Sequence, residues 1–286
     1  MLGPPSYIVH VPEVQPWACQ GVGVPHWWVK GFLVSLYGLG QSSPHEIAFE
    51  VELGPRFILD TLADCLSHSN SNLFQLSNLK RLDLSRDDFS GLLIPTKFGE
   101  LSSLTCLYLE YSGFTGVIPA EISHLSKLQV LSISTVDPYG LHLDSVSICS
   151  TIPLNFSSYL TTPWLPRTQL HGVLPERVFH LSYLEHLDLS FNSLTGPIPS
   201  NVSGLQNLQL LYLSSNYWNG TIPSCIFSLS SLQLFDLRNN SFSGKIQEFK
   251  FNNTLEFVSV KQNQLQGPIP KSLLDLQDLK FKTAKN

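Results

Sequence analysis

The chain has 286 residues, of which 43% are hydrophobic and only 14% carry a charge. This length is enough for one or two domains with a sizeable core, whereas the charged fraction lies well below the roughly 25% typical of soluble domains. The formal net charge is −5, and lysines and arginines do not cluster. The sequence therefore excludes nucleic acid as an expected partner and gives no electrostatic basis for binding an anionic membrane.

The first 67 residues contain no repeat and are rich in proline and tryptophan. We expect this non-repeat N-terminal segment, 1–67, to be irregular and poorly ordered rather than to form a cap. Residues 1–17 lack the basic and apolar regions of a signal peptide. No stretch of the chain approaches the ~20 apolar residues that a membrane-spanning helix needs. A signal peptide and a transmembrane helix are thus not predicted within this sequence.

The residue types that carry catalysis or bind metals show no recognisable pattern. Five cysteines are scattered without a C-x-x-C pair, and nine histidines lack ligand spacing, so a metal site is not expected. We expect Cys106, Cys149 and Cys225 to be buried like small apolar side chains. No G-x-G-x-x-G, Walker, G-x-S-x-G or H-E-x-x-H motif occurs. The prediction is a protein that is not an enzyme and has no cofactor, no metal and no catalytic residue.

One phrase, L-x-x-L-x-x-L-x-L-x-x-N-x-L-x-G-x-I-P, recurs from residue 76 onward. Its glycine occurs at steps of 24, 24, 24 and 23 residues, at Gly172, Gly196, Gly220, Gly244 and Gly267. This period lies within the 20–29 residues of leucine-rich repeats. We count about eight units in a repeat domain spanning 68–282, followed by a tail at 283–286. The last four units are regular, whereas those between 120 and 170 are stretched or interrupted by proline.

The spacing of the leucines predicts the geometry of each unit. The L-x-L core alternates with period two, which indicates a short strand with its leucines inward. No unit can bury its leucine face without neighbours, so the units must stack. The predicted fold class is an α/β leucine-rich-repeat solenoid with a parallel β-sheet on the concave face and an irregular or 3-10 convex side. The glycine permits a tight bend, and the proline fixes an extended turn before the convex side.

The asparagine slot of each unit turns the chain inward. A buried asparagine amide there can bond the backbone of its own and the adjacent turn. The predicted structural ladder consists of Asn192, Asn216, Asn240 and Asn263. In the earlier units the slot holds Asp87, Ser112, Val146 and Thr168. A valine forms no such bond, so we expect the first half to be less regular and less stable.

The phrase L-x-G-x-I-P at 24-residue spacing resembles the plant extracellular class of leucine-rich repeats. The runs FTGVIPAEISHLSKLQVL, at 114–131, and LTGPIPSNVSGLQNLQLLYLSSN, at 194–216, look like receptor-like proteins of the nightshade family, known for leaf-mould and Verticillium resistance. The resemblance covers about 68–282 and suggests a truncated member, because the family's leader, Cys-bounded caps and transmembrane helix have no counterpart. It implies the extracellular face of the plasma membrane and a co-receptor kinase as partner.

A rigid concave sheet that exposes aromatic side chains beside charges is typical of a surface that binds proteins or peptides. We predict non-enzymatic recognition of a protein or peptide ligand, including a pathogen-derived one, in defence or signalling. The alternative is a secreted inhibitor of a cell-wall-degrading enzyme, similar to the polygalacturonase inhibitors. The predicted ligand-binding residues are Arg81, Asp83, Arg86, Tyr108, Glu110, Tyr111, His186, Asp188, Phe191, Tyr212, Asp236, Arg238 and Lys261.

Asn-x-Ser/Thr sequons give five glycosylation candidates, namely Asn155, Asn201, Asn219, Asn239 and Asn252. Five sequons in one repeat array favour an ancestor that folded in the secretory pathway. Asn239 adjoins the ladder residue Asn240, so a glycan there is expected to shade part of the concave face.

Overall fold

The fold was obtained as a computed structural model. It describes residues 32–37, 48–53, 74, 78–135, 141–142, 157–202, 204–250, 255–275 and 280–282. The predictions for Val146, Cys149, Asn155, Asn252 and the tail lie outside the described residues.

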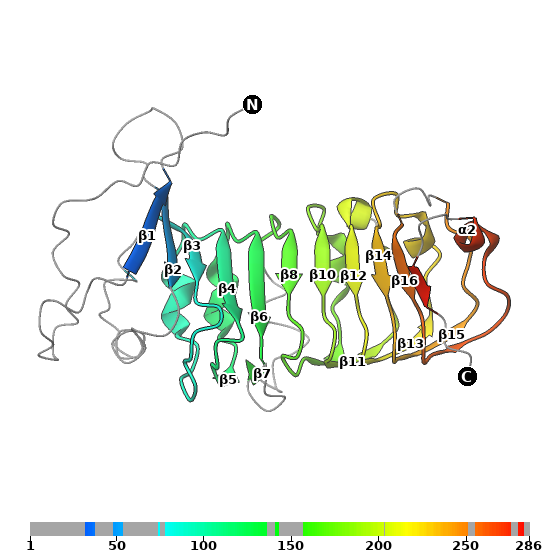
Figure 1. The fold of residues 1–286 in the computed structure, drawn as a ribbon, viewed down its shortest axis with the longest axis horizontal. Coiled ribbons are helices and arrows are strands. Elements are labelled where there is room, and N and C mark those ends of the chain that lie inside the picture. Colours follow the sequence, from blue (N-terminus) through cyan, green and yellow to red (C-terminus); the bar gives the residue numbers. More distant parts are fainter. Residues whose placement is uncertain are drawn as a thin grey trace, which may run out of the picture.

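Within these described ranges, the main sheet has eleven strands in the order β1-β2-β3-β4-β6-β8-β10-β12-β14-β16-β18. Eight of them supply one strand to each predicted unit, and Figure 1 shows them side by side along the long axis of the molecule. These eight are β3 (Leu79–Asp83), β4 (Cys106–Glu110), β6 (Val130–Ser134), β8 (Thr162–Trp164), β10 (His186–Asp188), β12 (Leu210–Tyr212), β14 (Leu234–Asp236) and β16 (Phe257–Ser259). Neighbours among them pair in parallel, which confirms the predicted solenoid.

Three further strands extend the main sheet beyond these eight. At one end, β1 (Phe32–Tyr37) pairs antiparallel with β2 (Ala48–Leu53), and β2 pairs in parallel with β3. At the other end, β18 (Lys280–Lys282) pairs in parallel with β16. Segment 1–67 therefore supplies two strands to the same sheet as the repeats.

A second parallel sheet, which the sequence did not predict, follows the ladder position of the regular units. Its strands are β9 (His171–Val173), β11 (Ser193–Gly196), β13 (Tyr217–Thr221), β15 (Ser241–Gly244) and β17 (Gln264–Leu265). A two-stranded counterpart, β5 (Gly116–Val117) and β7 (Leu141–His142), lies in an earlier part of the chain. Three of these short strands, β11, β13 and β15, carry one buried apolar residue and a glycine each, which is too little alternation to identify a strand.

The convex side is built from single turns, as predicted. They are the 3-10 helices η2 (Thr96–Glu100), η3 (Ala120–His124), η5 (Glu176–His180), η6 (Leu205–Asn207) and η7 (Ile226–Ser228), and the α-helical turn α2 (Lys271–Leu274). The proline that follows the inward isoleucine or leucine precedes several of them in an extended conformation, with φ −61° and ψ 136° at Pro119 and φ −61° and ψ 138° at Pro175. The expected extended turn before the convex side is therefore confirmed.

The leucines of the main sheet form one continuous core with the convex turns. Leu107 of β4 and Leu187 of β10 are fully buried, as are Phe98 and Phe227 of the turns. Burial of one such side chain contributes about 1.5–3 kcal/mol. In the interrupted unit, Pro163 is buried and aligns with Leu131 of the preceding strand. The proline therefore occupies a leucine position, and β8 keeps its place in the sheet.

The expectation of buried cysteines is wrong for the two that the structure describes. Cys106 and Cys225 are both only half-buried free thiols. Cys106 occupies a variable position of L-x-x-L-x-L, next to the buried Leu107, so its side chain leaves the core. Cys225 lies at the start of a convex turn, with its Sγ 3.1 Å from the Ser200 carbonyl oxygen.

Candidate ligand-binding face

The middle residue of each L-x-L core points away from the buried leucines, toward the concave face. Strand register aligns these residues in one row across the sheet, which we call the central column. The central column consists of Asp83, Tyr108, Ser132, Trp164, Asp188, Tyr212, Asp236 and Ser259. Aromatic and acidic side chains thus alternate along much of the face.

A second row, the flanking column, lies two residues earlier on each strand and on the same face. In β12, β14 and β16 it holds Leu210, Leu234 and Phe257, which are aligned by register and half-buried. These three residues are not among the predicted ligand-binding residues, although strict alternation of inward and outward positions along each strand identifies them. Together they place an apolar strip beside the central column.

The Asp83 carboxylate is paired with an arginine of its own strand. An Nη of Arg81 donates to its Oδ2 at 2.8 Å, and the guanidinium carbon lies 4.2 Å from the ring centroid of Tyr108 on the next strand. Burial opposes the charge of Arg81, but Tyr108 and Asp83 together raise its pKa above the ordinary value. The guanidinium is therefore held between a carboxylate and an aromatic ring.

Asp236 is also paired with an arginine. Its side chain is 1% exposed, and it accepts hydrogen bonds from the Nε of Arg238 at 2.9 Å and from an Nη at 2.6 Å. The hydrogen bonds that Arg238 donates to the Asp236 carboxylate raise the pKa of Arg238. This bidentate pair compensates the buried charge.

Asp188 is buried between two aromatic residues. Only 5% of the residue is exposed, and its Oδ1 accepts the Ser190 amide hydrogen at 2.8 Å. Trp164 and Tyr212 flank it on the neighbouring strands, with ring centroids 5.7 Å apart and planes inclined at 65°. Burial raises the pKa of Asp188 above its usual range, because the hydrogen bonds from Ser190 do not offset the loss of water.

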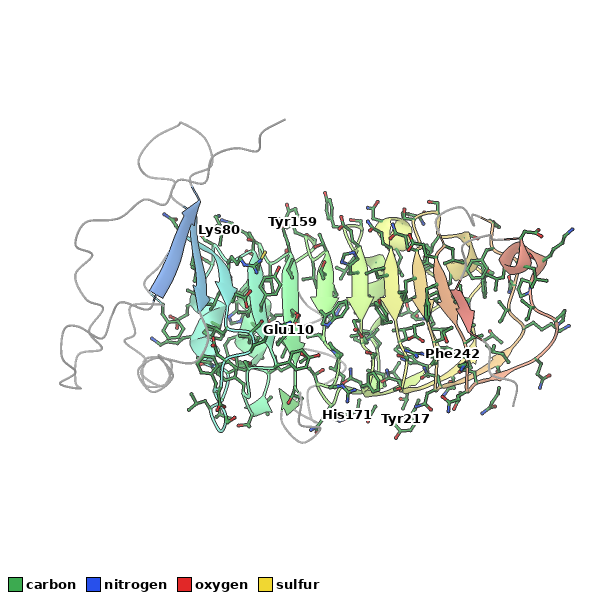
Figure 2. All side chains as sticks on the ribbon, viewed as in Figure 1. Lys80, Glu110, Tyr159, His171, Tyr217 and Phe242 are labelled. Atoms are coloured by element: carbon green, nitrogen blue, oxygen red, sulfur yellow. The ribbon has the colours of Figure 1, made fainter. Side chains whose placement is uncertain are left out.

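The other predicted ligand-binding residues lie at or just after the ends of the strands of the main sheet. Arg86, Tyr111 and Phe191 have positive φ angles of 65°, 52° and 55°, and Tyr111 and Phe191 are about half exposed. The guanidinium carbon of Arg167, which we did not predict, lies 4.0 Å above the Phe191 ring. Glu110 accepts a hydrogen bond from Ser132, and Figure 2 shows Glu110 on the main sheet. His186 and Lys261 are half-buried on or beside β10 and β16.

The ladder asparagines bond the backbone of two adjacent turns. The Nδ2 of Asn192 donates to the carbonyl oxygens of Leu189 at 3.0 Å and, one unit back, of Leu165 at 2.9 Å. Its Oδ1 accepts the amide hydrogens of Thr168 at 3.1 Å and Leu170 at 2.9 Å. The same pattern of donation recurs at Asn216, Asn240 and Asn263.

Two of the substituted ladder positions keep part of this bonding. The hydroxyl groups of Ser112 and Thr168 each donate at 2.9 Å to the carbonyl oxygen three residues earlier. Asp87 differs, because its Oδ2 is buried without a hydrogen-bond partner among the described residues. Burial, reinforced by the charge of Asp83, raises the pKa of Asp87 to about 6. The ladder position requires a hydrogen-bond donor, and an ionised carboxylate has no hydrogen to donate.

Three glycosylation candidates lie in the described part of the chain, and all are exposed. Asn201 precedes η6, Asn219 lies on β13, and Asn239 follows β14 with φ 54°. The Nδ2 of Asn239 lies 3.4 Å from the Ser215 hydroxyl oxygen. Figure 2 shows Tyr217, two residues before Asn219, at the edge formed by the second sheet.

The three histidines closest in sequence are placed on different faces. His171 lies on β9 of the second sheet, His180 on the convex η5 and His186 on β10. Within the described ranges, no three histidine, cysteine, aspartate or glutamate side chains gather in a way that would hold a metal ion. In the same ranges, every helix is too short or too polar to cross a membrane.

Family models match the repeats at three places. The model described as "Leucine rich repeat" matches residues 165–217 and 182–242. A second model of the same description matches residues 103–125. These matches fall on the regular units and on the unit that contains β4.

Known proteins extend the comparison to plant receptors. The receptor-like protein Cf-9 homolog of Solanum lycopersicum is 55% identical over 143 residues, which cover 44% of this chain and 17% of that protein. The crystal structure of a TDR receptor matches with TM-score 0.63 and 32% identity, over 73% of this chain and 35% of that chain. The Arabidopsis receptor kinase HAESA, in complex with the peptide hormone IDA and the co-receptor SERK1, matches with TM-score 0.65 and 30% identity over 75% and 35%.

The chain spans about a sixth of the length of the curated relatives that it matches. Within that part, the repeat phrase, the parallel main sheet, the asparagine ladder and the sequence identity agree. The chain is therefore built from leucine-rich repeats and, over about 44% of its length, is similar to the plant leucine-rich-repeat receptor-like proteins.

Proposed function

We propose that this chain is part of the ligand-recognition region of a plant receptor-like protein, and that it binds a peptide or protein on its concave face without catalysing a reaction. The central column carries the proposal. It sets charged and aromatic side chains in register on a rigid sheet, and such side chains dominate the energetics of protein interfaces. The thirteen residues selected from the sequence are the candidate contacts.

The comparisons support the chemical class of the ligand and the setting. HAESA was solved with a peptide hormone and the co-receptor SERK1, and RGFR1 with RGF2. By extension, we propose a co-receptor kinase as partner and the extracellular face of the plasma membrane as location. The similarity to nightshade resistance proteins favours a role in defence, with a pathogen-derived ligand.

The experiment is selection of a displayed peptide library on the immobilised chain, followed by affinity measurements on the enriched peptides. Tyr108→Ala and Tyr212→Ala on the concave face should each weaken binding about tenfold or more. Tyr217→Ala is the matched control, because Tyr217 is an exposed tyrosine on the second sheet. Enriched peptides that depend on Tyr217 and not on the concave tyrosines would overturn the proposal. Loss of fungal polygalacturonase activity on addition of the chain would instead support the inhibitor alternative.

A further inference from the structure

The central column contains three carboxylates, and two of them already hold an arginine. Asp83 is paired with Arg81, two residues before it, and Asp236 with Arg238, two residues after it. The third is Asp188. Among the residues that the structure describes, no arginine or lysine forms an ion pair with it.

The site at Asp83 shows how this face binds a guanidinium. The group lies 2.8 Å from the Asp83 carboxylate and 4.2 Å from the Tyr108 ring centroid. Asp83 and Tyr108 are partners in strand register. Asp188 and Tyr212 are partners in the same relation, one on β10 and the other on β12. The molecule therefore repeats the carboxylate and the ring at a second place.

In the residues that the structure describes, this second place has the carboxylate and the ring but no arginine. The strand position of Arg81 is taken there by His186, and that of Arg238 by Ser190. Trp164 supplies a second ring on the side opposite Tyr212. The Asp188 carboxylate is thus buried, flanked by two aromatic rings and, within the described part of the chain, hydrogen-bonded to Ser190. A nearby cation stabilises such a buried carboxylate more than it stabilises an exposed one.

We propose that Asp188, Trp164 and Tyr212 form a binding site for the guanidinium group of an arginine in the ligand. The assignment of that arginine to a ligand rests on the proposed function. Carboxylate and aromatic rings together favour a guanidinium, which forms paired hydrogen bonds and stacks on ring faces. The rise in the Asp188 pKa agrees with an uncompensated charge.

The flanking column adds a second requirement to the ligand. Leu234 and Phe257 lie two and three strands beyond β10, which is about 10 and 14 Å at the usual strand spacing. An extended peptide advances about 3.3 Å per residue. Since alternate residues of an extended peptide face the same side, a peptide that lies across the strands would place an apolar residue on Phe257 four positions from its arginine.

The test uses the whole chain and a small probe, N-acetyl-arginine methylamide. Binding is followed by NMR through the indole N–H signal of Trp164, which a Trp164→Phe variant identifies. The signal should shift saturably with the arginine probe and not with the matched citrulline derivative, which has the same shape and no charge. Asp188→Asn should weaken binding about tenfold or more. Asp275→Asn, an exposed aspartate beyond α2, is the matched control and should bind like the parent.

A second variant keeps the test decisive if Asp188→Asn fails to fold. His186→Arg restores at Asp188 the arrangement of Arg81 and Asp83, so its own guanidinium should fill the site. Circular dichroism should show a folded protein that no longer binds the probe. Equal shifts with arginine and citrulline, or full binding by His186→Arg, would overturn the proposal.

The two proposals fail in different ways. Library peptides that bind the concave face without enrichment of arginine, and whose affinity is unchanged in Asp188→Asn, would remove the arginine site and leave the proposed function. A chain that binds the arginine probe at Trp164 but selects no peptide would retain the site and count against the proposed function.

Discussion

The side-chain amide of Asn216 donates a hydrogen bond at 2.8 Å to the carbonyl oxygen of Leu189, which belongs to the preceding repeat. The same nitrogen lies 3.2 Å from the Leu213 carbonyl oxygen of its own turn. Its Oδ1 accepts the amide hydrogen of Leu194 at 3.0 Å. One buried side chain therefore satisfies backbone groups on both sides of a repeat boundary.

Asn216→Asp should destabilise the fold at neutral pH. The substitution keeps the shape and removes the hydrogens that the amide donates to the carbonyl oxygens of Leu189, Leu213 and Ser214. Each buried carbonyl group left unpaired costs about 1–3 kcal/mol. We expect a loss of about 2–4 kcal/mol in the free energy of unfolding, measured by urea titration on unglycosylated protein. Asn219→Asp, at an exposed asparagine of the same unit, controls for the added charge. Equal unfolding midpoints for the two variants would contradict the ladder's energetic role.

Asp87→Asn should stabilise the chain by about 1 kcal/mol at pH 7, a value reduced for the partial exposure of the side chain. The amide supplies the donor that this ladder position lacks and removes a charge from a site where the Asp87 Oδ2 is buried without a partner. The matched control Asp275→Asn, at an exposed aspartate, should not change the unfolding midpoint.

The same substitution should remove a pH dependence. The folded-state pKa of Asp87, about 6, lies above the ordinary value of about 3.9 in an unfolded chain. The folded protein binds the proton more tightly, so this contribution to stability is complete below about pH 4 and is lost as the pH rises through about 6. The stability gap between Asp87→Asn and the parent should widen over that range. A gap that stays constant from pH 4 to 7 would show that Asp87 titrates normally.

Gly204→Ala should destabilise the convex side. A Cβ at this position would lie 2.3 Å from the backbone carbonyl carbon of His180 in the preceding repeat. The two turns must then separate, at a cost of about 1–3 kcal/mol. Gln206→Ala, at an exposed position in the adjoining turn, should change the thermal unfolding temperature little. An alanine at 204 that is equally harmless would mean that the turns are packed less closely.

Trp218→Phe should be tolerated, whereas Trp218→Ala should not. The ring is fully buried, and its Nε1 has no hydrogen-bond partner in the part of the chain that the structure describes. Phenylalanine therefore removes an unsatisfied donor while losing some volume. Phe242 holds the same position in the next unit. We expect a change within about 1 kcal/mol for phenylalanine and a loss of about 3–5 kcal/mol for alanine. Comparable losses in both variants would indicate that the indole N–H is bonded after all.

The strands and the ladder were predictable because each depends on a residue type that recurs at a fixed interval. The alternation around Leu187 requires an inward leucine, and the position of Asn192 requires a side chain that both donates and accepts. The second sheet was not predictable, since a strand such as His171–Val173 contains no alternation of its own. Likewise, β1 and β2 join the sheet through backbone pairing, which the repeat pattern does not predict.

On the concave face, sequence reasoning selected Asp188 and Tyr212 but not Trp164. The prolines at 163 and 166 made a strand look doubtful there, although Pro163 is buried in a leucine position. The pairing of Arg81 with Asp83 could be predicted from the sequence, because residues two apart on a strand share a face. The contact between Trp164 and Tyr212 was not, because it bridges two strands across a third.

The hydrogen bond from Asn216 to Leu189 runs from one repeat to the next, as do the hydrogen bonds that pair the strands of the main sheet. A pull on the two ends of the array would therefore load these bonds in series and open the weakest boundary first. The unit around Asp87, whose ladder position donates no hydrogen bond when ionised, is such a boundary. Under tension, the repeat boundaries in the regular half of the array, from β10 to β16, should therefore open last.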